Sequence, residues 1–305
     1  MINPVWHPNF TMSSNISGSL KRIEMVRLVV ETVALPMHGG PMPRDRARVR
    51  ASFASASMEG GSVTLEQVAA IIADETVRLE GQEDDAIAVR NYGKAIQMAE
   101  QWAKMALPLT ETLICRFHRL AITGKSSRPT PLRKRKITEK YSFPDEIAYL
   151  PPRPEDLPEL IAVLEIWAED ARGGDLPVPV VAGIMQYQLY SLCPFNRGNG
   201  RTARLCSNYI LERDGYSLAG LLVPEEQYAG NLESYCQALG MKNGLDYYEE
   251  RAHADITPWL EYYLTSLAKS CETALSEMAA ILALRPEAGG SRREGKRKKS
   301  RGSSA

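Results

Sequence analysis

The stretch Cys193-Pro-Phe-Asn-Arg-Gly-Asn-Gly-Arg-Thr-Ala-Arg204 decides how the rest of the chain is interpreted. It places two glycines among three arginines and continues into an apolar-periodic segment that predicts a helix. Gly198 and Gly200 tolerate backbone angles that let neighbouring peptide N–H groups converge, and the positive end of the helix dipole adds to them. Arg201 and Arg204 are three residues apart and share a helix face. The stretch therefore predicts a phosphate-binding site.

The same stretch resembles the motif of the Fic family, His-x-Phe-x-(Asp/Glu)-Gly-Asn-Gly-Arg-x-x-Arg, at every position but two. The matching positions are Phe195, Gly198, Asn199, Gly200, Arg201 and Arg204. Cys193 replaces the family's histidine, and Arg197 replaces its acidic residue. In that family the histidine takes a proton from a target hydroxyl, which attacks the α-phosphate of ATP and captures AMP, while the acidic residue holds Mg²⁺.

The two replacements change the chemistry that the resemblance implies. Cys193 is the candidate catalytic residue, but a thiol with an ordinary pKa of about 8.5 is mostly protonated at neutral pH. Three roles stay open for it: a base, a nucleophile whose pKa is lowered by nearby cations, or an inert position. Arg197 is expected to neutralise phosphate, because a guanidinium is not a ligand for Mg²⁺. The sequence predicts no metal site, which puts the Mg²⁺ requirement in doubt.

A second motif lies upstream, in Ser55-Ala-Ser-Met-Glu59-Gly60. It resembles the inhibitory-helix motif, (Ser/Thr)-x-x-x-Glu-(Gly/Asn), of Fic proteins that carry their own inhibitor. The resemblance implies that Glu59 forms an ion pair with Arg204 and blocks the position of the γ-phosphate. Taken alone, Glu59 is equally a solvated carboxylate at a helix end. Thr64 and Gln67 form a capping-box pattern that predicts the start of the next helix.

Apolar residues recur at helical spacing through most of the chain. The segments with this spacing are 20–35, 84–106, 109–120, 154–172, 178–192, 228–239 and 257–284. The resemblance implies an all-α, mainly helical Fic/Fido fold with a small β-hairpin flap, for which residues 126–150 are the candidate, and a nucleotide-binding tyrosine on the helix after the motif, Tyr235. We interpret His118 as a packed core residue rather than a ligand.

The flap candidate carries the basic run 133–136. In the Fic family this hairpin aligns the backbone of a target protein beside the active site by strand addition. The run either meets an acidic target or a nucleotide, or forms a solvated loop. A protein target is therefore expected at residues 126–150.

Composition indicates an ordinary globular protein with a distinct tail. We expect a loose lead-in over 1–18, an N-terminal helical region with the inhibitory helix over 19–108, a Fic domain over 109–284 and a basic, disordered tail over 285–305. The tail gives the only hint of nucleic-acid binding. An odd number of cysteines, five, without paired spacing argues against a disulfide framework or a zinc site. We expect a cytoplasmic protein, since neither an export signal nor a membrane-spanning stretch is evident.

Three functions remain open at this point. The first is a Fic-type transferase that uses ATP or another phosphate-containing donor, by ordinary or altered, Cys193-dependent chemistry. The second is a non-catalytic, nucleotide-responsive binding module. The third is a helical protein whose two motif matches arose by chance. The sequence leaves the donor, the target and the oligomeric state open.

Overall fold

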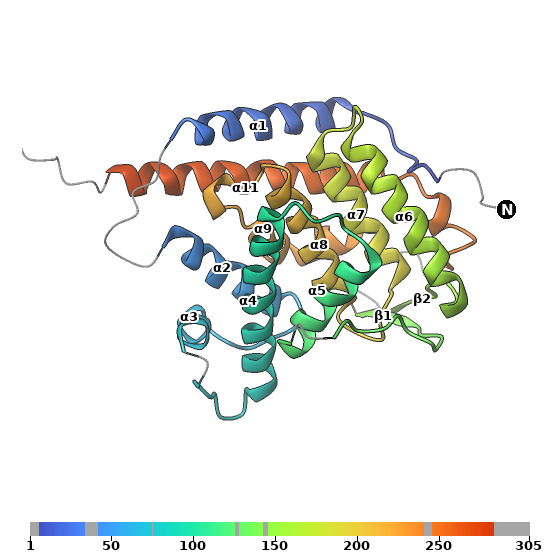
Figure 1. The fold of residues 1–305 in the computed structure, drawn as a ribbon, viewed down its shortest axis with the longest axis horizontal. Coiled ribbons are helices and arrows are strands. Elements are labelled where there is room, and N and C mark those ends of the chain that lie inside the picture. The colour runs from blue at the N-terminus through green and yellow to red at the C-terminus, as the bar shows by residue number, and fades with distance from the viewer. Residues whose placement is uncertain are drawn as a thin grey trace, which may run out of the picture.

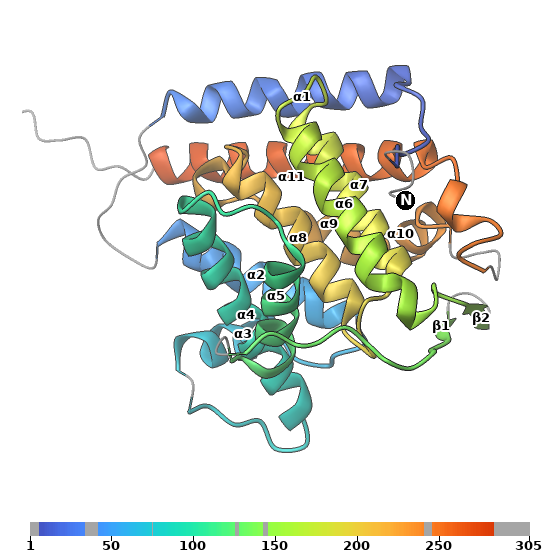
Figure 2. The same ribbon diagram turned by 45° about the vertical axis from the view of Figure 1, so that its right-hand side comes forward.

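The computed structural model describes residues 6–33, 42–74, 76–125, 128–142, 146–240 and 246–283. Within these ranges the chain is mainly helical, as predicted, with one pair of short strands (Figures 1 and 2). The helices are α1 (Ser14–Glu31), α2 (Pro43–Ser57), α3 (Leu65–Ala73), α4 (Glu83–Lys104), α5 (Glu111–Thr123), α6 (Leu157–Arg172), α7 (Val178–Leu192), α8 (Asn199–Arg213), α9 (Pro224–Gly230), α10 (Leu232–Ala238) and α11 (Thr257–Ala283). Short 3-10 helices occupy Pro154–Asp156, Leu218–Gly220 and Arg251–His253. The predicted tail, 285–305, lies outside the described residues.

Helix α7 runs through the core and sets the position of the motif. Its sequence is apolar on nearly all sides, and accordingly almost all of its residues are buried, against α6, α8 and α11. Gly183 permits a close approach of α11, because a Cβ atom there would lie 2.7 Å from Cδ1 of Tyr263. Trp259 Nε1 also donates a hydrogen bond to the Gly183 carbonyl at 2.8 Å. Helix α7, which leads into the motif, is therefore held in place by the core.

Helix α1 lies along α11 on one side of the molecule (Figures 1 and 2). It begins at Ser14, inside the range 1–18 that we predicted as a loose lead-in. The prediction missed the capping serine: Ser13 Oγ accepts from the Ile16 N–H and donates to Glu261 at 2.6 Å. Trp6 also packs edge-on against Trp167. This part of the lead-in is thus held by a cap and an aromatic contact.

Helices α2, α3 and α4 form a group beside α8 (Figure 2). The predicted capping box is present: the Gln67 N–H donates to Thr64 Oγ1 at 3.3 Å, and the Thr64 N–H donates to Gln67 Oε1 at 2.7 Å. Asn231 divides the single helix predicted over 228–239 into α9 and α10. Its φ of −150° is not helical, and its side chain accepts from the Ser234 N–H to cap α10.

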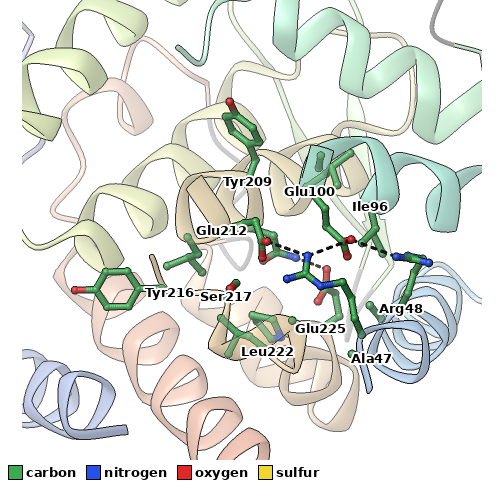
Figure 3. Close-up of a pocket in the computed structure, with 18 residues that line it drawn as sticks. Ala47, Arg48, Ile96, Glu100, Tyr209, Glu212, Tyr216, Ser217, Leu222 and Glu225 are labelled. Atoms are coloured by element: carbon green, nitrogen blue, oxygen red, sulfur yellow. Dashed lines mark hydrogen bonds and ion pairs between the residues drawn. The ribbon is translucent and has the colours of Figure 1, made fainter. Parts of the chain in front are cut away.

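Arginines attach α2 to the rest of the protein. Arg44 lines a hollow between α2, α4 and α8, and its Nη1 lies 3.2 Å from Glu100 and 3.0 Å from Glu212. Figure 3 shows Glu100 and Glu212 in this hollow. At the same helix, Arg50 Nη1 contacts Glu277 of α11 at 2.6 Å. No residue of 193–204 lines this hollow. The basic half of α2 is therefore anchored away from the motif.

The two strands, β1 (Glu139–Ser142) and β2 (Glu146–Tyr149), pair antiparallel with Glu139 opposite Tyr149. They lie within the segment 126–150, near the end of α7 that precedes Cys193 (Figure 1). In the part of the chain that the structure describes, no helix combines the length and apolar character needed to cross a membrane.

Candidate functional site

The loop from Cys193 to Gly198 joins the end of α7 to the start of α8. Cys193 has φ 43° and ψ 63°, and Gly198 has φ 73° and ψ 17°. Both are left-handed conformations, which glycine adopts freely and a cysteine adopts at a cost. Cys193, the residue that the sequence analysis predicts to be catalytic, therefore has the strained backbone conformation in this loop.

Side chains from the start of α8 and from α5 hold the loop's shape. The Asn199 side chain donates to the Phe195 carbonyl and accepts from the Phe195 N–H, each at 2.9 Å. The His118 ring stacks on Phe195 with centroids 3.8 Å apart, and His118 Nε2 lies 3.0 Å from the Arg197 carbonyl oxygen. Because a carbonyl oxygen only accepts, Nε2 carries the proton. His118 is buried, as predicted, but it packs on the motif loop.

Gly198 and Gly200 have no Cβ atom, and this allows neighbouring side chains to pack closely against their backbone. A Cβ atom on Gly198 would lie 2.4 Å from Cδ1 of Ile122, which brings the loop close to α5. A Cβ atom on Gly200 would lie 3.3 Å from Nη1 of Arg204 and from the ring of Tyr190. Gly200 thus lets the Arg204 side chain run alongside the first turn of α8.

Glu59 contacts both arginines of the motif. Its Oε2 lies 2.7 Å from Nε of Arg201, and its Oε1 lies 3.3 Å from Nη2 of Arg204. The same Nη2 donates to Ser55 Oγ at 2.9 Å. The ion pair predicted between Glu59 and Arg204 is present, and Arg201 joins it. One carboxylate therefore engages both guanidinium groups at the start of α8.

The end of α2 presents Glu59 to these arginines. Ser55 lies in the last turn of α2 and is buried, whereas Glu59 lies in the turn after Ser57. Gly60 closes that turn with φ 82°, a conformation that favours glycine, and its N–H donates to the Ser57 carbonyl at 3.1 Å. Within this motif, Ser55 and Glu59 make the contacts and Gly60 shapes the turn.

Comparison with known proteins identifies the central part of this architecture. The model of the Fic/DOC family matches residues 108–211, which include α5, α7, the loop and most of α8. These residues form a Fic/DOC family domain.

One curated relative is similar in sequence, and two solved structures are similar in fold. A protein of Drosophila grimshawi named Protein adenylyltransferase Fic is 25% identical over 225 residues, which are 72% of this chain and 45% of that relative. The chain thus spans less than half the length of that relative. A Fic family protein from Desulfovibrio desulfuricans has a TM-score of 0.71 at 24% identity, over 89% of this chain and 77% of the other. A Fic domain containing signaling protein from Bacteroides thetaiotaomicron has a TM-score of 0.68 at 21% identity, over 88% and 98%.

The thiol of Cys193 lies inside the Fic domain. It is 1% exposed, and its Sγ donates to the Tyr190 carbonyl at 3.1 Å. The thiol hydrogen is thus directed to a backbone carbonyl inside the protein. Neither a nucleophile nor a base is exposed at this position in the present arrangement.

Arg133 corrects our interpretation of the basic run 133–136. It is 3% exposed, and its guanidinium donates to the carbonyls of Cys193 at 2.8 Å and Pro152 at 2.5 Å. Lys134, Arg135 and Lys136 are exposed. Arg133 is therefore buried and hydrogen-bonded to the motif loop, and the other three residues of the run are exposed to solvent.

Arg204 is almost completely buried, with 4% of its side chain exposed. Burial by itself lowers the pKa of this guanidinium, but the hydroxyls of Tyr235 and Tyr92 and the carboxylates of Glu59 and Glu225 outweigh that effect and raise the pKa. Tyr235 is 2% exposed and packs among core aromatic rings. Tyr235 thus lies in the core beside Arg204, and its role in nucleotide binding stays a prediction.

Arg197 extends into solvent while its carbonyl points inward to His118. A guanidinium supplies no oxygen ligand for Mg²⁺, and within the described ranges no cluster of three or more His, Cys, Asp or Glu side chains is placed to hold a metal ion. The residues present do not fit the Mg²⁺ that the Fic motif implies. Because Arg197 is exposed, solvent also screens its charge more than a buried position would.

Sequence reasoning missed the residues that support the loop from a distance. Tyr149 at the end of β2 donates to the Ser191 carbonyl at 2.6 Å, and Arg251 donates to Ser191 Oγ at 2.7 Å. The Arg251 guanidinium also lies 5.1 Å from the Tyr149 ring centre and 4.9 Å from that of Tyr187. These contacts fix β2 to α7 two residues before Cys193. No local pattern signals them, because the partners are far apart in sequence.

Proposed function

We propose that this Fic domain binds the phosphates of a nucleoside triphosphate at the start of α8, and that Glu59 competes with the γ-phosphate for Arg204. The observation that carries the proposal is the contact of one carboxylate with both Arg201 and Arg204. Carboxylate and phosphate oxygens use the same guanidinium donors, so the Glu59 oxygens occupy positions suited to phosphate oxygens. In this proposal the region 19–108 inhibits the domain 109–284.

The geometry supports a local displacement of Glu59. Its side chain is 36% exposed and lies in the turn after α2, whereas Arg44 and Arg50 anchor the helix on the other side. A phosphate that displaced Glu59 would therefore leave most of α2 in place. Gly60, with its left-handed backbone, is the natural pivot for this movement.

ATP is the donor we favour, and transfer of AMP to a protein hydroxyl is the first candidate reaction. The name of the Drosophila relative, Protein adenylyltransferase Fic, supports it. The pair of strands β1 and β2 would align the backbone of the target, since a strand edge beside the loop offers hydrogen bonds to an extended segment. With Cys193 and Arg197 at the two altered positions, such a transfer requires chemistry that differs from the ordinary Fic reaction.

A second candidate is a nucleotide-responsive binding module that transfers nothing. The burial of Cys193 and the hydrogen bond from its thiol to Tyr190 favour this candidate. Here the nucleotide would act only by releasing Glu59. Incubation with ATP labelled on the α-phosphate separates the two candidates: protein-bound label supports the transferase, and nucleotide binding without label supports the binding module.

Calorimetry tests the shared part of the proposal. The variant Glu59→Gly should bind ATP, and the added change Arg204→Ala should weaken that binding at least about 30-fold, given roughly 2 kcal/mol for a hydrogen bond to a charged group. The matched control is Arg22→Ala in the same background, because Arg22 pairs with Glu272 at an exposed contact between α1 and α11. Absence of nucleotide binding by Glu59→Gly would contradict the proposal.

A further inference from the structure

We infer that His118 is a positioning residue for phosphate binding, which orients the Arg197–Gly198 peptide so that the Gly198 N–H points toward the anion. The inference rests on the proposed function and adds a residue of α5 to the machinery of the same site. Nothing in the sequence motif includes His118, which lies 75 residues before Cys193 by the printed numbering.

The planarity of the peptide bond fixes the direction of the Gly198 N–H. His118 Nε2 donates to the Arg197 carbonyl at 3.0 Å, so this carbonyl points toward α5. In a planar trans peptide the C=O and the following N–H point in opposite directions. The Gly198 N–H therefore points away from α5. Gly198 then enters α8 in a left-handed conformation, so this N–H stands beside the first-turn N–H groups of the helix.

Two further contacts fix the loop on α5. The His118 ring stacks on Phe195, with an angle of 20° between the ring planes. One helical turn after His118, Ile122 packs closely on Gly198. A Cβ atom added to Gly198 would lie only 2.4 Å from Ile122 Cδ1. The peptide between these two contacts has little freedom to rotate. The hydrogen bond from His118 thus selects the one orientation in which the Gly198 donor faces outward.

The environment of His118 distinguishes this role from simple packing. Its Nδ1 is buried and has no hydrogen-bond partner, so the ring carries a polar atom that packing alone does not need. Burial, together with the charges of Arg201, Arg197 and Arg119, lowers the pKa of His118 to about 4. The ring is therefore neutral at physiological pH and keeps its proton on Nε2, where the Arg197 carbonyl accepts it.

Two substitutions separate the hydrogen bond from the ring stacking. In the Glu59→Gly background, His118→Phe keeps a flat ring against Phe195 but has no donor, and His118→Gln supplies an N–H near the position of Nε2 without a ring. We expect His118→Phe to weaken ATP binding about tenfold, as loss of one charge-assisted contact would. His118→Gln should stay within about threefold of the parent. The matched control is His253→Phe, at an exposed histidine outside the motif loop.

Stability and the Gly198 amide provide independent measurements. The thermal midpoint of His118→Phe should stay close to that of the parent, because loss of the unpartnered Nδ1 offsets loss of the donor to the Arg197 carbonyl. The NMR shift of the Gly198 amide should change in His118→Phe and stay close to the parent in His118→Gln, with or without nucleotide. Equal ATP affinity of His118→Phe and the parent, or equal losses in both variants, would overturn the inference. If Glu59→Gly binds no nucleotide, the proposed function fails, and the Gly198 amide alone decides whether His118 orients the peptide.

Discussion

The two halves of the motif, Cys193 to Arg197 and Gly198 to Arg204, differ in how many residues of the Fic motif they retain. From Gly198 to Arg204 the chain has every residue of the Fic motif, and its arginines already hold a carboxylate. From Cys193 to Arg197, the positions of the family's histidine and acidic residue are both replaced. The Cys193 thiol is buried and donates to the Tyr190 carbonyl, and the Arg197 side chain is exposed to solvent. In the proposed function, the side chains that would transfer a group therefore differ from those that would bind the anion. Changes to the side chains of Cys193 and Arg197 should affect transfer more than anion binding, although Phe195 and the Arg197 carbonyl help to hold the shape of the loop.

The largest effect is expected from restoring the first half. Cys193→His with Arg197→Asp, in the Glu59→Gly background, should raise AMP transfer about 10²–10⁴-fold, the usual contribution of a general base, once the acidic residue can also hold Mg²⁺. Labelled AMP on the protein or on a lysate target measures it. Cys193→His alone should not suffice, because Arg197 still supplies no metal ligand. Robust transfer by the unaltered chain would show that Cys193 and Arg197 support catalysis as they stand.

A second change should loosen the first half while the second half keeps its function. Arg133→Ala removes a buried guanidinium that binds the carbonyls of Cys193 and Pro152, so it should cost about 4 kcal/mol of unfolding free energy. Denaturant unfolding measures this loss, and the exposed neighbour variant Lys134→Ala is the control. ATP binding in the Glu59→Gly background should change little. A large loss of ATP affinity without a loss of stability would mean that the halves are not independent.

The pH dependence of stability tests the buried, neutral state of His118, which packs on Phe195 and donates to the Arg197 carbonyl. Burial lowers the pKa of His118 to about 4, against about 6.5 in an unfolded chain. Between these values the unfolded state binds a proton that the folded state does not, so stability falls as pH decreases from about 6.5 to 4. Relative to His118→Phe, the wild type should lose up to about 3 kcal/mol over this range. Parallel profiles of the two proteins would contradict the buried, neutral state of His118.

The sequence predicted those features that local patterns encode. Helical spacing indicated the mainly helical fold, and the capping box at Thr64 located the start of α3. The contact between Glu59 and Arg204 followed from a resemblance of motifs, although the residues are 145 positions apart. These predictions succeeded because each depends on short-range spacing or on a motif with a fixed partner.

Other features depend on contacts that no short pattern contains. Arg133 belongs to a basic run for which we predicted either contact with an acidic target or a nucleotide, or a solvated loop. Only the fold shows that its guanidinium is buried on the motif loop. The sequence also did not show that Tyr235, the predicted nucleotide contact, packs among the aromatic rings of the core. Likewise, His118 was predicted to be packed, whereas its partner, the loop itself, was not predictable. Long-range packing decides the role of such residues.

The most direct test of the central claim compares the ATP and ADP affinities of the wild type and Glu59→Gly by calorimetry. If Glu59 occupies the γ-phosphate position at Arg204, its removal should tighten ATP binding about tenfold more than ADP binding, because only ATP carries the competing phosphate. Glu59→Gln, which keeps the size of the side chain but not its charge, should give a smaller difference in the same direction. Equal gains for ATP and ADP would contradict the claim that Glu59 excludes the γ-phosphate.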